Sequence, residues 1–287
     1  MMASEQPHEP AVDRLLHISD LHFWEIVRNP LKLMSKRFLG NLNVIFHRRH
    51  EFDSGMAQPC AQQLAALGVP TLFAGGDFTS TAMDGEFTQA ADYLRSLKHL
   101  GMQVIVTPGN HDVYTFEAAR KKRFEQYFKE FLPESGYPAL YHLPGGTPFI
   151  VLDVARPNIL TSRGEVSGKI LTKTAELLAG ISAPRILVGG HFPILHITSE
   201  YHSHWSRQLL NAHALRELLG TCGKQVLYVA GHVHRQSLTV DADHSSLTHL
   251  TTSAFFSRGK HGAQEGGFSE IAVSADGFQV TRHTFSG

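Results

Sequence analysis

Six short apolar segments recur along the chain, and several are separated by stretches with helical periodicity. The apolar segments cover residues 14–19, 71–75, 103–108, 149–153, 185–189 and 225–231. Each has the length and composition of a buried strand. Around Phe87, Phe124 and Leu215, apolar residues instead recur three or four positions apart, which predicts amphipathic helices. Strands that alternate with helices predict an α/β fold containing parallel strand pairs.

The pattern changes after residue 234. Four further apolar segments follow one another without a helical stretch, at residues 237–240, 247–252, 268–273 and 278–283. They predict consecutive strands of an antiparallel sheet. The chain of 287 residues has no internal repeat, low-complexity tract or linker, so we expect one domain over residues 1–287.

Five of the predicted strands are followed directly by Asp, Asn or His, in most cases beside glycine. These clusters are Asp20-Leu21-His22, Gly75-Gly76-Asp77, Gly109-Asn110-His111-Asp112, Gly190-His191 and Gly231-His232-Val233-His234. Any one of them alone is ordinary loop chemistry, because Asn, Asp and Gly favour turns. In an α/β sheet, ligands bind outside the carboxyl ends of the strands. We therefore expect all five clusters to meet at one edge of the fold.

The side chains of these clusters are typical metal ligands. They offer carboxylates, imidazoles and an amide but no thiolate, which suits Mn, Fe or Zn rather than a structural zinc cage. The two cysteines, Cys60 and Cys222, are far apart, and Cys60 shares a helical stripe with Met56 and Leu64 that predicts a buried thiol. The donors exceed what one ion needs, which indicates a pair of ions. Paired ions can clamp a phosphoryl group and activate a water.

The order of the motifs from Asp20 to His234 resembles that of the calcineurin-like metallophosphoesterases. The resemblance implies a four-layer α/β/β/α sandwich with two divalent metal ions, Mn in the first place and Fe or Zn as alternatives. It assigns one ion to Asp20, His22, Asp77 and His234, and the other to Asp77, Asn110, His191 and His232, with Asp77 bridging. It also implies that His111 is the general acid and that Asp112 orients its imidazole. A turn or cap role for Asp112 is the equal alternative.

A basic amphipathic insertion, residues 23–52, separates the first cluster from the next predicted helix. One helical face would carry Leu31, Met34, Phe38, Leu42 and Ile45, and basic residues include Lys32, Lys36, Arg37, Arg48 and Arg49. No acid lies between Glu25 and Glu51. Basic charge beside an apolar face is typical of a helix in a membrane interface, although the same face could pack on the domain. The membrane interpretation predicts an amphiphilic phosphate substrate and peripheral contact with the inner face of the membrane.

Three short strings in this insertion carry a closer resemblance. Asn29-Pro30-Leu31, Ser35-Lys36-Arg37 and Leu39-Gly40-Asn41 are similar to the insertion of the chlamydial-type UDP-2,3-diacylglucosamine pyrophosphatases. That resemblance implies hydrolysis of UDP-2,3-diacylglucosamine to 2,3-diacylglucosamine 1-phosphate and UMP in lipid A biosynthesis. A second histidine-rich segment, residues 196–205, could touch the substrate or be a surface loop.

Other functions predict different features. A soluble phosphodiesterase for cyclic nucleotides or small phosphodiesters would share the metal site without the membrane role. A nuclease is disfavoured because 26 basic residues balance 26 acidic ones and no basic groove with aromatic residues is visible. A non-enzymatic scaffold would lack part of the ligand set. The polar start of the chain and the absence of an apolar run of about 18 residues predict a cytoplasmic protein.

Overall fold

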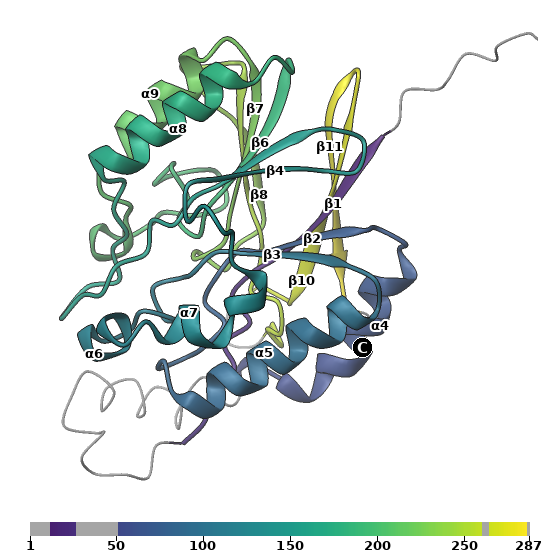
Figure 1. The fold of residues 1–287 in the computed structure, drawn as a ribbon, viewed down its shortest axis with the longest axis vertical. Helices are drawn as coiled ribbons and strands as arrows, with labels where there is room; N and C mark the ends of the chain where they lie inside the picture. The colour runs from purple at the N-terminus through teal and green to yellow at the C-terminus, as the bar shows by residue number, and fades with distance from the viewer. Residues whose placement is uncertain (1–11, 27–50, 260–263, 286–287) are drawn as a thin grey trace, which may run out of the picture.

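The computed structural model describes residues 12–26, 51–259 and 264–285 and contains two β-sheets (Figure 1). The first sheet has the order β11-β10-β1-β2-β3 and the second β4-β5-β6-β7-β9-β8. The strands of the first sheet are β1 (Asp13–Ile18), β2 (Thr71–Ala74), β3 (Gln103–Val106), β10 (Gly267–Ser274) and β11 (Gly277–Thr284). Those of the second are β4 (Ala139–His142), β5 (Pro148–Val151), β6 (Arg185–Gly189), β7 (Gln225–Ala230), β8 (Ser237–Val240) and β9 (Leu247–Thr251).

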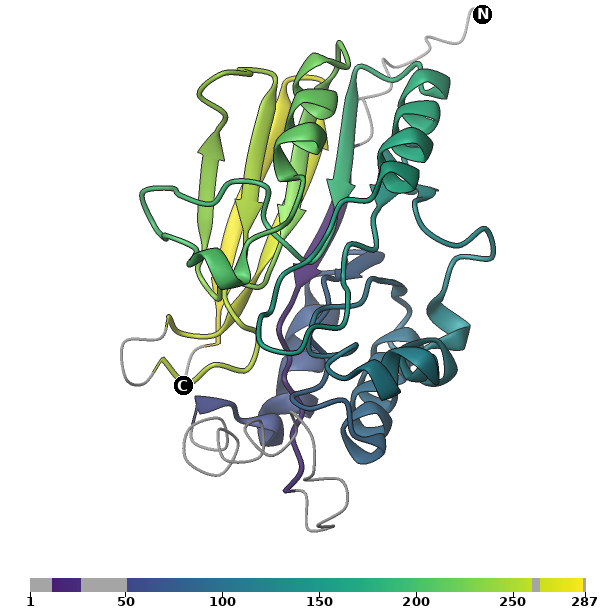
Figure 2. The same ribbon diagram turned by 90° about the vertical axis from the view of Figure 1, so that its left-hand side faces the viewer.

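Helices cover the outer face of each sheet. On the first sheet lie α4 (Ala57–Ala66), α5 (Asp84–His99), α6 (Phe116–Arg120) and α7 (Arg123–Tyr127), and on the second α8 (Gly168–Gly180) and α9 (Ala212–Thr221). Short 3-10 helices are η2 (Ser54–Met56), η3 (Lys129–Phe131) and η4 (Trp205–Arg207). Figures 1 and 2 show α4 and α5 on one side of the two sheets and α8 and α9 on the other. The predicted four-layer α/β/β/α arrangement is therefore confirmed.

The central strands of each sheet are apolar on both faces because both faces are buried. On β1, Leu15 points into the core between the two sheets, whereas Leu16 belongs to the core under the helices of the first sheet. A third apolar core lies between the second sheet and α8 and α9. Since neighbouring residues of a strand face opposite sides, a strand covered on both sides has no polar face. This explains the uninterrupted apolar segments of the sequence.

Parallel pairing brings the strand ends together. In the first sheet β1, β2 and β3 are parallel, and in the second β5, β6, β7 and β9 are parallel. The carboxyl ends of the parallel strands in each sheet therefore lie at one edge, where the polar clusters follow.

The predicted antiparallel sheet after residue 234 is wrong, although all four strands occur. β8 and β9 pair with each other but β9 joins the second sheet parallel to β7, while β10 and β11 join the first sheet antiparallel to β1. In Figure 2 the yellow strands run beside the purple β1. An apolar pattern reports which faces are buried, not which strand is the neighbour. The sequence also missed β4 and α8, and the helix predicted around Phe124 is divided into α7 and η3.

The predicted insertion lies largely outside the described residues. This applies to Leu31, Lys32, Met34, Lys36, Arg37, Phe38, Leu42 and Ile45. At its two ends, Phe23 forms a bridge with Thr79 and Phe52 forms one with Ser257. Among the described residues, no helix is both long and apolar enough to cross a bilayer.

Candidate metal centre

The polar clusters from both sheets converge into two groups of potential ligands. Asp20, His22 and His234 form one group, and Asp77, His191 and His232 form the other. In each group, one ligand atom from every residue lies within 4.8 Å of the others. Asp20 and His22 follow β1, Asp77 follows β2, His191 follows β6, and the last two histidines follow β7. We call these groups the open triad and the buried triad, because only His234 of the six is partly exposed.

The backbone at these positions adopts a conformation that few side chains favour. Positive φ angles of 50–68° occur at Asp20, His22, Asp77, His232 and His234. The left-handed region is uncommon for residues other than glycine, although Asp and His enter it more readily than most. Such local strain clusters at functional sites, where the surrounding structure enforces it. Here the turns direct side chains from successive strands toward one space.

In the open triad, polar atoms converge on a common point. The His22 and His234 Nε2 atoms are 3.0 Å apart, and the Asp20 Oδ1 atom lies 3.2 Å from the His234 Nε2 atom. Among the described residues, no group forms a hydrogen bond of good geometry with the buried Asp20 Oδ1 atom. A buried carboxylate oxygen without a partner is costly unless a cation compensates it. This arrangement fits a divalent metal ion.

The buried triad is arranged in the same way and includes Asn110. The His191 Nε2 atom lies 3.4 Å from the Asp77 Oδ2 atom and 3.3 Å from the Asn110 Oδ1 atom. The same Asp77 oxygen is 3.9 Å from the His22 Nε2 atom of the open triad. Asp77 therefore lies between the two groups, in the position of a bridging ligand.

Backbone carbonyls determine the tautomers of three histidines. The His22 Nδ1 atom lies 3.3 Å from the Thr79 carbonyl oxygen, and the His191 Nδ1 atom lies 2.8 Å from that of Gly75. The His232 Nε2 atom lies 2.9 Å from the Arg207 carbonyl oxygen. A carbonyl only accepts hydrogen bonds, so the nitrogen facing it carries a proton and the other ring nitrogen is the one that can bind a metal ion. This is how proteins orient histidines that bind metals.

In each of the carboxylates of Asp20 and Asp77, one oxygen accepts a hydrogen bond from a backbone amide and the other faces the ligand group. The Asp20 Oδ2 atom accepts a hydrogen bond from the His232 amide at 2.9 Å, and the Asp77 Oδ1 atom accepts one from the His111 amide at 2.7 Å. In each carboxylate the other oxygen faces the ligand group. A Cβ at Gly109 would collide with the Asp77 carboxylate and amide, which explains glycine there.

The charges of the site favour a cation. Burial alone would raise the pKa of Asp20 and Asp77, but His234 lowers the pKa of Asp20 and His191 lowers that of Asp77. Burial alone would lower the pKa of His191, yet the Asp77 and Asp20 carboxylates raise it to about 9. Burial and the nearby His191 lower the pKa of His232 to about 3. The carboxylates thus attract positive charge into a buried space, and divalent ions would supply it.

His111 lies beside the open triad. Its ring contacts the His22 ring edge-on, with 5.1 Å between the ring centroids, and stacks on the Tyr114 ring, with 5.2 Å between the centroids. Its Nδ1 atom donates to the Ser80 carbonyl at 2.7 Å, because a carbonyl can only accept. The general-acid role that the sequence predicts for His111 would therefore use the other ring nitrogen, Nε2.

The Asp112 carboxylate forms hydrogen bonds with the loops around His111, and not with the His111 imidazole. Its Oδ1 atom accepts from the Thr79 amide at 3.0 Å and the Thr79 hydroxyl at 3.1 Å, and its Oδ2 atom accepts from the Gly109 amide at 2.8 Å. The expectation that Asp112 orients His111 is corrected by these contacts, since the Ser80 carbonyl has that position. Asp112 has the turn role that the sequence left as the alternative.

Sequence reasoning missed several groups that position the ligands. Thr79, Ser80, Gly75 and Arg207 act here through carbonyl oxygens. Every residue has a carbonyl, so no residue type signals this role. The histidine-rich segment 196–205 does reach the site: its last part and His232 line a pocket of about 360 Å³.

Comparisons with known proteins agree with this geometry. The model of the calcineurin-like phosphoesterase family matches residues 13–236. No curated protein sequence matches the chain. The fold is similar to that of a dimetal phosphatase from Danio rerio, with a TM-score of 0.63, 15% identity, and 96% of this chain and 99% of that chain covered.

A second similar structure is the purple acid phosphatase of yellow lupin (Lupinus luteus) seeds. Its TM-score is 0.56 with 13% identity, and the match covers 99% of this chain and 54% of that chain. At these identities the two structures show the likeness of the fold. Together with the family match and the two ligand triads, they lead to one conclusion: the chain belongs to the calcineurin-like phosphoesterase family and is a metal-dependent phosphoesterase with residues for two divalent ions.

Proposed function

We propose that this phosphoesterase hydrolyses the pyrophosphate of UDP-2,3-diacylglucosamine, which gives 2,3-diacylglucosamine 1-phosphate and UMP. The observation that carries the reaction class is the position of Asp77, whose Oδ2 atom is 3.4 Å from a histidine of one triad and 3.9 Å from a histidine of the other. When bound, two ions at these triads would offset the charge of the phosphoryl group and activate a water.

In this proposal the side chains have separate roles. The triads and Asn110 hold the ions, and Asp77 is shared between them. As the water oxygen bonds to phosphorus and the bond to the leaving oxygen breaks, His111 donates a proton from Nε2 to that oxygen, and the proton released by the attacking water passes to the solvent. The Ser80 carbonyl accepts a hydrogen bond from Nδ1 throughout and so holds the imidazole in place.

An apolar groove supports the proposal that the substrate carries acyl chains. It lies between α4 and α5, has a volume of about 680 Å³, and is lined in part by Phe23, Ala57, Ala61, Tyr93 and Leu100. One lining residue, Phe23, directly follows the ligand His22 in the sequence. We assign it to an acyl chain of the substrate.

The substrate is tested with purified protein and Mn²⁺ in detergent. The assay compares UDP-2,3-diacylglucosamine with 2′,3′- and 3′,5′-cyclic nucleotides, and mass spectrometry identifies the products. We expect metal-dependent formation of UMP and the lipid monophosphate. Turnover of cyclic nucleotides without any action on the lipid would overturn the proposal in favour of the soluble phosphodiesterase.

The membrane role rests on residues outside the described part of the chain. Changing Leu31, Phe38 and Ile45 to Ser should strongly reduce cleavage of the lipid and leave a small water-soluble phosphodiester nearly unaffected. Reversing Lys32, Lys36 and Arg37 to Glu should weaken binding to anionic vesicles, and salt should weaken binding of the unaltered protein. A large fall in melting temperature with parallel loss of both activities would show that the apolar face packs on the domain.

A further inference from the structure

A cationic pocket adjoins the metal centre on the side of His232. Its volume is about 360 Å³, and it is lined by Glu200, Tyr201, His202, Ser203, His204, Arg207, His232, Val233 and Arg235. Among the described residues, the lining includes the guanidinium groups of Arg207 and Arg235 and a single carboxylate, that of Glu200. A pocket of this charge next to a phosphoesterase site fits an anion rather than an apolar group.

Arg207 is anchored next to the metal centre. Its carbonyl oxygen accepts the hydrogen bond from the His232 Nε2 atom at 2.9 Å, so one imidazole ring separates the Arg207 backbone from the ligand nitrogen. No acidic side chain of the described residues forms an ion pair with the Arg207 guanidinium, which is exposed at the pocket. The guanidinium can therefore bind an anion from outside the chain.

The segment that carries Arg207 is held in place by its own hydrogen bonds. The Arg207 amide donates to the His204 carbonyl at 2.8 Å, and the Ser162 amide donates to that of Ser206 at 2.8 Å. The Gln208 side-chain amide donates to the Ser203 carbonyl at 2.9 Å. The pocket is thus preformed, which lowers the entropy cost of binding.

We infer that this pocket is a subsite for a second phosphate of the substrate, the one that is not attacked, and that Arg207 is the residue that recognises it. The inference rests on the proposed function and deepens it. A guanidinium presents paired donors that match two phosphate oxygens. In a pyrophosphate, one bridging oxygen separates the second phosphorus from the first. Arg207 is close enough to reach that second phosphate, because only the His232 imidazole separates its backbone from the metal-binding nitrogen. A substrate with a single phosphate would leave the subsite unused.

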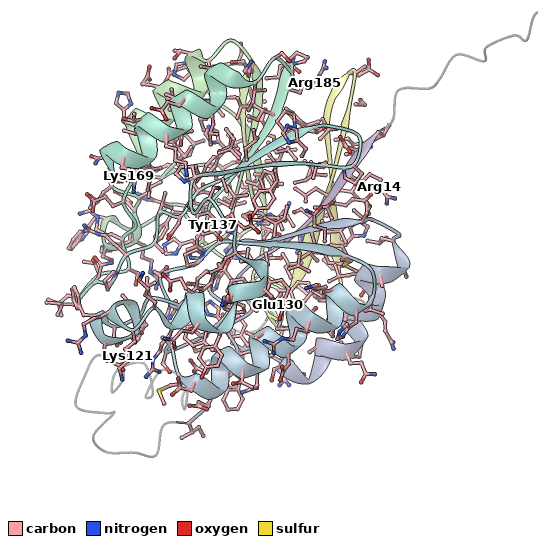
Figure 3. All side chains as sticks on the ribbon, in the orientation of Figure 1. Arg14, Lys121, Glu130, Tyr137, Lys169 and Arg185 are labelled. Atoms are coloured by element: carbon pink, nitrogen blue, oxygen red, sulfur yellow. The ribbon has the colours of Figure 1, made fainter. Side chains whose placement is uncertain are left out.

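The test uses two matched probes, bis(4-nitrophenyl) phosphate and P1,P2-di(4-nitrophenyl) pyrophosphate. Arg207→Ala should lower the ratio of kcat/KM for the pyrophosphate to kcat/KM for the monophosphate by about 10- to 100-fold, the usual range for a charge-assisted pair. Arg207→Lys should recover part of the ratio, and Arg207→Glu should lower it further. Arg185→Ala is the matched control, because Arg185 begins β6 and so lies at the edge away from the metal centre (Figure 3).

The outcomes separate the subsite from the proposed substrate. Equal losses for both probes would overturn the inference and show that Arg207 acts only through the position of His232. Cleavage of the pyrophosphate probe with the expected Arg207 dependence, but none of UDP-2,3-diacylglucosamine, would keep the subsite and reject the substrate. If neither probe is cleaved, calorimetric binding of both probes to the metal-loaded protein replaces kcat/KM, and an unchanged ratio of affinities in Arg207→Ala overturns the inference.

Discussion

The two ligand triads have the same kinds of residues but differ in their surroundings. In the buried triad, backbone carbonyls fix both His191 and His232. In the open triad a carbonyl fixes His22, whereas the His234 side chain is 28% exposed and no carbonyl of the described residues holds it. Ligands that are oriented in advance bind a metal more tightly. We therefore expect the buried triad to retain its ion and the open triad to exchange it more readily.

The largest effect on turnover should come from replacing Asp77, the ligand that lies between the two triads. Asp77→Ala removes one ligand from both ions, so it should abolish turnover, beyond the loss of about 10²–10⁴-fold expected for a general acid, and lower the content of both metals. Native mass spectrometry of the variant and of the unaltered protein measures the number of bound ions. The control is Glu176→Ala, which changes an exposed carboxylate on α8. A variant with two ions and full activity would show that Asp77 is not the bridge.

His111 belongs to neither triad, so its replacement should separate catalysis from metal binding. His111→Asn should keep both ions and slow cleavage by about 10²–10⁴-fold. The loss should shrink for nitrophenyl esters, whose leaving groups need no proton. Measurements of kcat with a series of leaving groups test this. An equal loss across the series would instead assign His111 to positioning the phosphate.

A third prediction tests the comparison directly. His191→Ala should deprive the protein of the ion in the buried triad, whereas His234→Ala should weaken only the exchangeable ion, by about 10- to 100-fold or more in affinity. Metal titration followed by calorimetry measures the two steps. His213→Ala, at a histidine that is 80% exposed on α9, is the control. Equal loss of both ions in the two variants would contradict the difference between the triads.

The sequence predicted the ends of β1, β2, β3, β6 and β7 well, because these central strands are buried on both faces and each is followed by a polar cluster. The convergence of Asp20 with Asp77, and of His191 with His232, follows from the parallel pairing of β1 with β2 and of β6 with β7. The groups that orient the ligands could not be predicted, because the Ser80 and Arg207 contacts use backbone carbonyls whose positions depend on the complete fold. The same is true of β9 and β10, since sheet partners are chosen by tertiary packing.

The smallest effect should come from Asp112, which supports the loop of both the metal ligand Asn110 and the acid His111. Burial, together with the Asp77 carboxylate, raises the pKa of Asp112 to about 7, but its oxygens are occupied by Thr79 and Gly109. Asp112→Asn can keep the acceptor that faces Thr79, yet its amide group would then meet the Gly109 amide, donor against donor.

The cost of that buried mismatch should be about 1–3 kcal/mol in the free energy of unfolding. Denaturant unfolding of the metal-free protein measures it without interference from bound ions. The matched control is Asp92→Asn at a carboxylate that is 64% exposed, where the change should stay within about 0.5 kcal/mol. Both metals should still bind, because Asp112 itself contacts neither triad. If Asp112→Asn instead leaves stability unchanged and removes the leaving-group dependence assigned to His111, then Asp112 acts on the imidazole after all, and the role given to the Ser80 carbonyl is wrong.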